Sequence, residues 1–195
     1  MNEIRPIAWA NGTLRLLDQT RLPLEEIIVE ARGYLEAVDA IKTMRVRGAP
    51  AIGVTAAYAV AMAARDLEVS DRATFLQRLA EAGAEIKAAR PTAVNLMWAV
   101  DRMIGIANSE ADINTAKTQL LEEATRIEKE DEEINRRMGS HGIELMPDGG
   151  SVLTHCNAGA LATAAYGTAV GVIRAGWEDG KRFKVFNTET RPFLQ

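Results

Sequence analysis

Cysteine is almost absent from this sequence, because only one of its 195 residues is a cysteine. A single thiol cannot form an internal disulfide, which excludes the class of small secreted domains that disulfides hold together. Residues 1–10 lack a basic segment followed by an apolar core and a small-residue cleavage site, so we expect no signal peptide. Together these two features predict a cytoplasmic protein.

Clusters of basic residues and long apolar runs are also missing. The 23 Lys and Arg residues are outnumbered by 27 Asp and Glu residues, and they form no basic block. This pattern argues against a nucleic-acid partner. The longest weakly polar stretch, Gly48 to Ala64, is rich in alanine and falls short of the roughly 20 strongly apolar residues of a membrane span. We therefore expect no membrane partner, and we predict that this stretch forms a buried helix.

The N-terminal residues, 1–31, have the pattern of strands. An Asn11-Gly12 pair lies among leucines and is typical of a two-residue hairpin turn, and a β-branched run follows at residues 27–29. A small antiparallel β cap is the expected result. With 47% hydrophobic and 26% charged residues, the whole chain has the composition of a globular protein that can bury a substantial core.

From Tyr34 onward the apolar residues recur at helical spacing. Pro50 suits the first turn of a helix, and Gly142 suits the end of one. We expect the charged face of the last long helix, including Glu122-Glu123 and residues 128–133, to be solvated. The expected helices cover residues 34–44, 50–65, 71–89, 92–107 and 110–141.

After residues 147–150 the pattern changes to a strand at 151–154, a helix at 159–175 and a strand at 183–187, which is a βαβ unit. The predicted class is α+β. A mainly helical domain with a small β cap spans residues 1–147, and the first βαβ unit of a Rossmann-like α/β domain spans 148–195. Two parallel strands with one helix leave a sheet face bare. We therefore expect either that a partner chain covers it or, preferably, that the natural protein continues.

The only cysteine, Cys156, lies in the stretch SVLTHCNAGA (151–160), where the predicted strand meets the predicted helix. A thiolate at a helix N-terminus is stabilised by the macrodipole, which would make Cys156 usable as an acid, a base or a nucleophile. A buried structural cysteine is the alternative. Neighbouring residues on an extended chain point in opposite directions, which argues against a catalytic pair with His155. With only His141 besides, we expect no metal site.

Small residues recur every fourth position after this corner. They form a ridge without bulk, which favours close packing of a helix rather than ligand binding. No GxGxxG or GxxxxGK[ST] motif occurs, so a nucleotide-binding interpretation has no support from motifs. The ridge consists of Gly159, Thr163, Gly167, Gly171 and Ala175.

Two arginine-containing corners complete the candidate site. In the segment 45–50, the guanidinium of Arg47 precedes Gly48 at a predicted helix start, so side-chain donors and backbone N–H groups can converge on one phosphate. The segment 90–92, Arg-Pro-Thr, has the same arrangement of arginine, proline and helix. Loop arginines are more often simply solvated. If these two corners and Cys156 meet in the fold, they form a site for a phosphorylated small molecule.

Four stretches of the sequence stand out together. They are MRVRGAPAIGV (44–54), RPTAVNLMWAVDRM (90–103), THCNAGALAT (154–163) and NTETRPFLQ (187–195). These stretches resemble the 5-methylthioribose-1-phosphate isomerase family of methionine salvage, and the likeness extends in order over essentially the whole chain. That family shares its fold with the alpha, beta and delta regulatory subunits of the translation-initiation guanine-nucleotide exchange factor and with ribose-1,5-bisphosphate isomerase.

The resemblance implies an aldose-to-ketose isomerisation of 5-methylthioribose 1-phosphate by a homodimer without a metal or organic cofactor. The family's general-acid aspartate and an Asn-Lys contact lie in a region that this sequence does not contain, so we expect the 195 residues alone to be inactive. A regulatory subunit and a ribose-1,5-bisphosphate isomerase are the alternatives. The implied residues are Arg47, Gly48, Ala49, Arg90 and Gln195 for substrate binding and Cys156 for catalysis.

Overall fold

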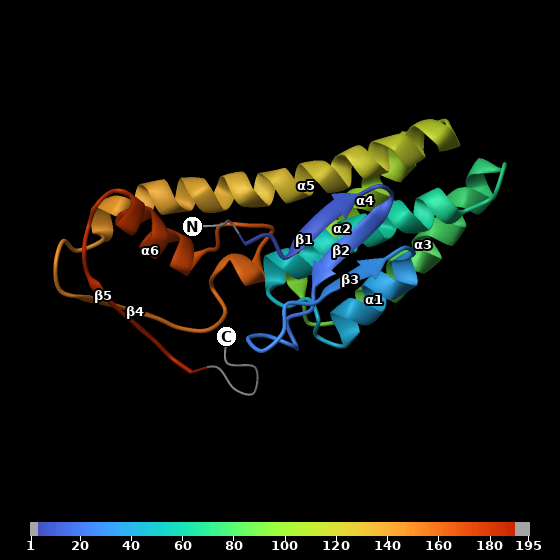
Figure 1. The fold of residues 1–195 in the computed structure, drawn as a ribbon. Helices are drawn as coiled ribbons and strands as arrows, with labels where there is room; N and C mark the ends of the chain where they lie inside the picture. Colours follow the sequence, from blue (N-terminus) through green and yellow to red (C-terminus); the bar gives the residue numbers. More distant parts are fainter. Residues whose placement is uncertain (1–3, 190–195) are drawn as a thin grey trace.

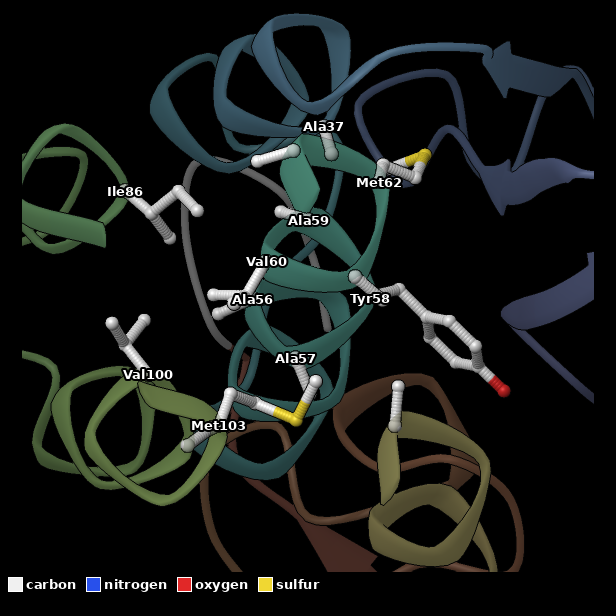
Figure 2. Packing of buried hydrophobic residues seen from close by; sticks show 14 of the residues in the cluster. Ala37, Ala56, Ala57, Tyr58, Ala59, Val60, Met62, Ile86, Val100 and Met103 are labelled. Atoms are coloured by element: carbon white, nitrogen blue, oxygen red, sulfur yellow. The ribbon is translucent and has the colours of Figure 1, made fainter. Parts of the chain in front are cut away.

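Helix α2 (Ala49–Asp66) lies at the centre of the N-terminal part, in a computed structural model that describes residues 4–189 (Figure 1). All its side chains from Ala51 to Ala64 are buried, as expected for a helix that is apolar on every side. Figure 2 shows how its neighbours approach, with Val60 pointing between Ile86 and Val100 and with Ala57 close to Met103. The prediction of a buried helix is confirmed.

Four further helices pack around α2. Asp71 begins α3 by accepting a hydrogen bond from the Thr74 N–H at 2.8 Å, and Asp112 begins α5 in the same way. Pro50 lies in the first turn of α2, as predicted. The predicted bounds of all five helices agree with the structure to within a few residues, and the four neighbours are α1 (Tyr34–Lys42), α3 (Arg72–Ala88), α4 (Val94–Ser109) and α5 (Ile113–Gly142).

The β cap forms as the sequence predicts. Strands β1 (Ile7–Ala10), β2 (Thr13–Leu17) and β3 (Ile28–Ala31) make an antiparallel sheet in the order β1-β2-β3. Asn11 and Gly12 join the first two strands, with φ of 51° and 77°. A two-residue hairpin turn of type I′ needs positive φ at both positions, which explains this pair of residues.

The charged face of α5 is less solvated than predicted. Glu123 is only 3% exposed, and its carboxylate pairs with Arg102 at 2.5 Å and with Arg126. Glu128 is half-buried and accepts a hydrogen bond from the Tyr58 hydroxyl. The prediction of a solvated face is wrong at these positions, because α2 and α4 pack against the same helix and bring their own polar partners.

Gly142 ends α5 where predicted, but for another reason. Its φ of −77° is right-handed, and a short 3₁₀ turn, η1 (Ile143–Leu145), follows directly. A Cβ atom at Gly142 would lie 2.3 Å from Cγ1 of Val172, which is too close for any side chain. The glycine therefore permits helix packing rather than the left-handed ending typical of helix-terminal glycines.

The C-terminal part is the predicted βαβ unit. Strands β4 (Ser151–Thr154) and β5 (Lys184–Asn187) pair in parallel, and α6 (Ala169–Glu178) connects them and packs against the second half of α5 (Figure 1). Leu153 and Phe186 are neighbours in the register and are 72% and 57% exposed. The predicted division after residue 147 falls between η1 and β4, and it stays a prediction.

The helix predicted for 159–175 is wrong over its first half. Residues 155–168, which we name the cysteine loop, contain only one 3₁₀ turn, η2 (Ala160–Ala162), and α6 begins at Ala169. Gly159 and Gly167 instead form an antiparallel bridge, and a Cβ atom at Gly167 would lie 2.7 Å from the Gly159 carbonyl carbon. The small-residue ridge is therefore helical only at Gly171 and Ala175, which lie in α6.

Candidate functional site

The first corner of the candidate site is the arginine loop, which we define as residues 45–49. Gly48 has a φ of 95°, which favours glycine, and its carbonyl accepts the N–H of Ile52 at 2.9 Å to start α2. Arg45 pairs with Asp18 and Asp39 at 3.8 and 3.6 Å, so it holds the loop in place. Ala49, the first residue of α2, is exposed and presents the N-terminus of a long helix to solvent.

Arg90 is the second corner. It follows α3 in a turn, 90–93, that is closed by a hydrogen bond from the Ala93 N–H to the Arg90 carbonyl at 2.9 Å. Pro91 occupies the second position of this turn, where its fixed φ is favourable. The prediction that proline opens the next helix is wrong here, because α4 begins only at Val94.

Arg90 and Cys156 both lie close enough to Arg47 to act on its charge. Burial lowers the pKa of the Arg47 guanidinium, the like charge of Arg90 lowers it further, and the Cys156 group acts in the opposite direction. Three segments that are far apart in the sequence therefore converge, which the sequence alone left open. Two neighbouring guanidinium groups form a natural receptor for an anion.

Cys156 itself is exposed and adopts a φ of 65° two residues after the end of β4. A positive φ costs a non-glycine residue about 1 kcal/mol, and such strain is concentrated at functional positions. Because no α-helix starts between Cys156 and Ala169, the predicted support of a thiolate by a helix N-terminus is wrong. His155 bonds elsewhere, with its Nδ1 atom 2.8 Å from the Thr188 hydroxyl oxygen.

Two polar side chains beside Cys156 were missed by the sequence reasoning. The Thr154 hydroxyl and the Asn157 side-chain nitrogen are buried atoms that have no hydrogen-bond partner among residues 4–189. Buried polar atoms in proteins nearly always have partners, so these two are candidates for contacts with a ligand. The signal in the sequence was their position on either side of the cysteine, at the end of a strand.

A cleft of about 290 Å³ lies between α2, α4 and α5 and includes Pro50, Asn95 and Trp98 in its wall. Neither this cleft nor one of about 370 Å³ beside Trp9 and Lys117 is lined by the three converging residues.

The predicted contact Gln195 lies outside the described residues. Within residues 4–189, His, Cys, Asp and Glu form no group of three that could hold a metal ion, and no helix is long and apolar enough to cross a membrane.

The comparison with family models identifies the chain's family. The model described as the Initiation factor 2 subunit family matches residues 45–195, and the chain belongs to this family. That span contains both arginine corners and Cys156. The family includes proteins of more than one kind, as individual relatives make clear.

Curated relatives carry the name methylthioribose-1-phosphate isomerase. The protein from Acetivibrio thermocellus is 53% identical over 194 residues, which are 98% of this chain and 57% of that protein. The protein from Desulforudis audaxviator is 52% identical over 193 residues, or 98% of this chain and 55% of that protein. The chain thus spans about half the length of the curated relatives it matches.

Solved structures confirm the fold and include two kinds of protein. A 5-methylthioribose 1-phosphate isomerase from Pyrococcus horikoshii OT3 has a TM-score of 0.90 and 39% identity, over 98% of this chain and 54% of that one. A structure described as translation initiation factor eIF-2B, subunit delta, from A. fulgidus has a TM-score of 0.86 and 44% identity, over 98% and 56%. The resemblance recognised in the sequence is confirmed.

Proposed function

We propose that this chain supplies part of the active site of an isomerase that converts 5-methylthioribose 1-phosphate to 5-methylthioribulose 1-phosphate in methionine salvage. The observation that carries the proposal is the convergence of Arg47, Arg90 and Cys156, which gives two cationic donors and one thiol at a common place. The name shared by the curated relatives supports the choice of substrate.

The substrate phosphate is assigned to the two arginine corners. Arg47 and Arg90 offer planar guanidinium donors, and the backbone N–H groups of Gly48 and Ala49 lie at the N-terminus of α2. A helix N-terminus next to a guanidinium is a favourable place for phosphate, because both present hydrogen-bond donors and positive charge. Gln195 remains a predicted further contact.

The reaction requires proton transfers to and from the sugar. Phosphate on the anomeric oxygen prevents the simple opening available to a free sugar, so the bond between C1 and the ring oxygen must break as that oxygen gains a proton. One hydrogen then moves from C2 to C1, as a proton or as a hydride, while the C2 hydroxyl loses its proton and becomes the carbonyl. The atoms balance without an external oxidant or reductant. We assign Cys156 the role of general acid or general base in these transfers.

The first experiment measures binding of 5-methylthioribose 1-phosphate to the 195-residue chain by calorimetry. Replacing Arg90 with methionine is expected to weaken binding about 10- to 100-fold, because a charge-assisted hydrogen bond is lost. The control is Arg78→Met, at an exposed position of α3. Equal affinities of the two variants would contradict the assignment of Arg90.

Catalysis is tested separately. We expect no turnover by the 195 residues alone, and turnover would contradict that expectation while supporting the isomerase. In the full-length protein, Cys156→Ser is expected to lower kcat at least 100-fold, as for other acid and base groups. A normal kcat in this variant would remove Cys156 from the mechanism. Ribose 1,5-bisphosphate, assayed beside the methylthioribose substrate, tests the bisphosphate alternative.

A regulatory subunit is the second candidate, and the likeness to the structure described as eIF-2B subunit delta favours it specifically. A regulatory subunit would not be expected to bind 5-methylthioribose 1-phosphate, because it needs no affinity for a sugar phosphate at the arginine corners. Absence of binding in calorimetry, with a correctly folded chain, would favour this second function. The presence of Arg47, Arg90 and Cys156 together favours the first.

The whole protein is further proposed to be a cytoplasmic homodimer. The single cysteine is compatible with a reducing compartment. Apolar side chains remain exposed on α4 and α5, among them Trp98, Ile134 and Met138, and exposed apolar patches often mark association surfaces. Light scattering coupled to size-exclusion chromatography of the full-length protein tests the dimer, and a monomeric mass would contradict it.

A further inference from the structure

Gln19 is hydrogen-bonded to both loops of the candidate site. It lies just beyond β2 and is only 4% exposed. Its backbone N–H donates to the carbonyl of Arg45 at 3.0 Å, in the arginine loop. Its side-chain Nε2 donates to the carbonyl of Leu161 at 2.7 Å, in the cysteine loop, 142 positions away in the sequence. A single buried residue therefore connects two segments that carry different parts of the site.

The two loops are also in direct backbone contact beside this bridge. A Cβ atom at Gly48 would lie 2.4 Å from Cα of Ala162, so the chain next to Leu161 rests on the arginine loop. Two residues further along the cysteine loop, the Ala164 N–H donates to the carboxylate of Asp131 in α5 at 2.7 Å. The hydrogen bond from Gln19 thus acts at the point where the two loops meet.

The side-chain bond is the part of this arrangement that a substitution can remove cleanly. The bond between the Gln19 N–H and Arg45 is made by the backbone and survives a change of side chain. Without the amide group, the partly buried Leu161 carbonyl loses a partner, and such a loss favours movement of the group toward water. The cysteine loop can respond by shifting away from Gly48, since it contains little regular structure.

We propose that Gln19 is a positioning residue that sets the spacing between Arg47 and Cys156 by bridging the arginine loop and the cysteine loop. It acts through the loops and does not itself touch substrate. The inference rests on the proposed function, because the spacing matters only if both residues serve one ligand.

The test compares Gln19→Met with the unchanged chain by hydrogen exchange, without any ligand. Methionine has a similar length but no donor. Amides of residues 157–168 are expected to exchange at least about tenfold faster, while those of α2 and α3 change less than about twofold. Gln77→Met, at an exposed position of α3, is the matched control. Unchanged exchange in the loop, or equally faster exchange in α2, would overturn the proposal.

A second variant keeps the proposal testable if methionine prevents folding. In Gln19→Glu the carboxyl group can donate to Leu161 only while it is protonated. Relative to the unchanged chain at the same pH, loop exchange is expected to be faster at pH 7 and similar at pH 4. Equally faster exchange in α2 at pH 7 would indicate a general loss of packing and would count against the bridge. A difference that does not depend on pH would count against the bridge.

Binding of 5-methylthioribose 1-phosphate then separates the two proposals. If the unchanged chain binds the sugar phosphate, Gln19→Met is expected to bind it about tenfold more weakly and Gln77→Met equally well. Equal binding by all three would overturn the role of Gln19 and leave the proposed function intact. If the unchanged chain does not bind, the proposed function fails, and the exchange data still decide whether Gln19 holds the loops together.

Discussion

The helical part of the chain buries apolar residues on every side of α2, whereas the parallel strand pair leaves most of its apolar residues exposed. In α2 every side chain from Ala51 to Ala64 is buried, while all four residues of β5 are exposed. Stability therefore resides in the helical part. The site lies at the boundary, because the arginine corners belong to the first region and Cys156 to the second.

The largest expected effect tests this contrast with one substitution in each region. Leu120→Ala in α5 removes a side chain that is 0% exposed, and we expect a loss of about 2 to 5 kcal/mol in the free energy of unfolding. Leu153→Ala in β4 should cost less than about 0.5 kcal/mol, because that side chain is already in water. Urea unfolding followed by circular dichroism measures both. Similar losses would mean that the strand pair is covered in solution.

A smaller effect is expected where the two regions meet. Gly142→Ala places a methyl group 2.3 Å from Val172, so α5 and α6 must move apart, at a cost of about 1 to 3 kcal/mol. Gly105→Ala is the control, because nothing lies within 4 Å of the new atom and a helical alanine is about 0.5 to 1 kcal/mol more stable than glycine. Tryptic cleavage after Lys181 or Arg182 should accelerate only in the first variant. Equal cleavage of both would show that α6 does not depend on this contact.

The smallest effect concerns pH and lies within the helical part. Burial raises the pKa of Glu128 above its ordinary 4.5, and the hydrogen bond from Tyr58 only partly opposes this. The native carboxyl group therefore holds its proton more tightly than the unfolded one. Its contribution to stability is complete below pH 4.5 and is lost as the pH rises through the native pKa.

Glu128→Gln removes this titration and leaves an acceptor for the Tyr58 hydroxyl. Relative to the unchanged chain, the variant should gain stability as the pH rises from 4.5 through the native pKa of Glu128, which urea midpoints at several pH values can measure. The other carboxylates of α5 are present in both proteins, so the difference isolates Glu128. The control is Glu122→Gln, at an exposed position. A difference that stays constant with pH would contradict the effect of burial.

Much of the fold could be predicted because local chemistry specifies it. The Asn11-Gly12 pair determines the hairpin, Asp71 and Pro50 determine helix starts, and the composition of α2 implies its burial. For the site, the sequence indicates three separate corners, and the structure places Arg90 and Cys156 near Arg47. The roles of these residues remain predictions.

The predictions that are wrong concern segments where contacts with distant residues decide the structure, rather than the local sequence pattern. The spacing of small residues after Cys156 is typical of a helix. Gly159 and Gly167 form a backbone bridge instead, which is possible because neither has a side chain. Glu123 looked solvated because nothing in its neighbourhood of the sequence reveals Arg102. Gln19 carried no signal at all, since its partner lies in the other half of the chain.

The exposed position of Cys156 has a consequence for newly made protein. Helical turns close between residues four apart within about a microsecond, but β4 can pair with β5 only when Ser151 meets Lys184. A chain synthesised from its N-terminus can thus complete α2 before the cysteine loop has a fixed place. The thiol is the last of the three converging groups to be located. Folding does not bury this thiol, so oxidants can reach it both before and after the cysteine loop has its place.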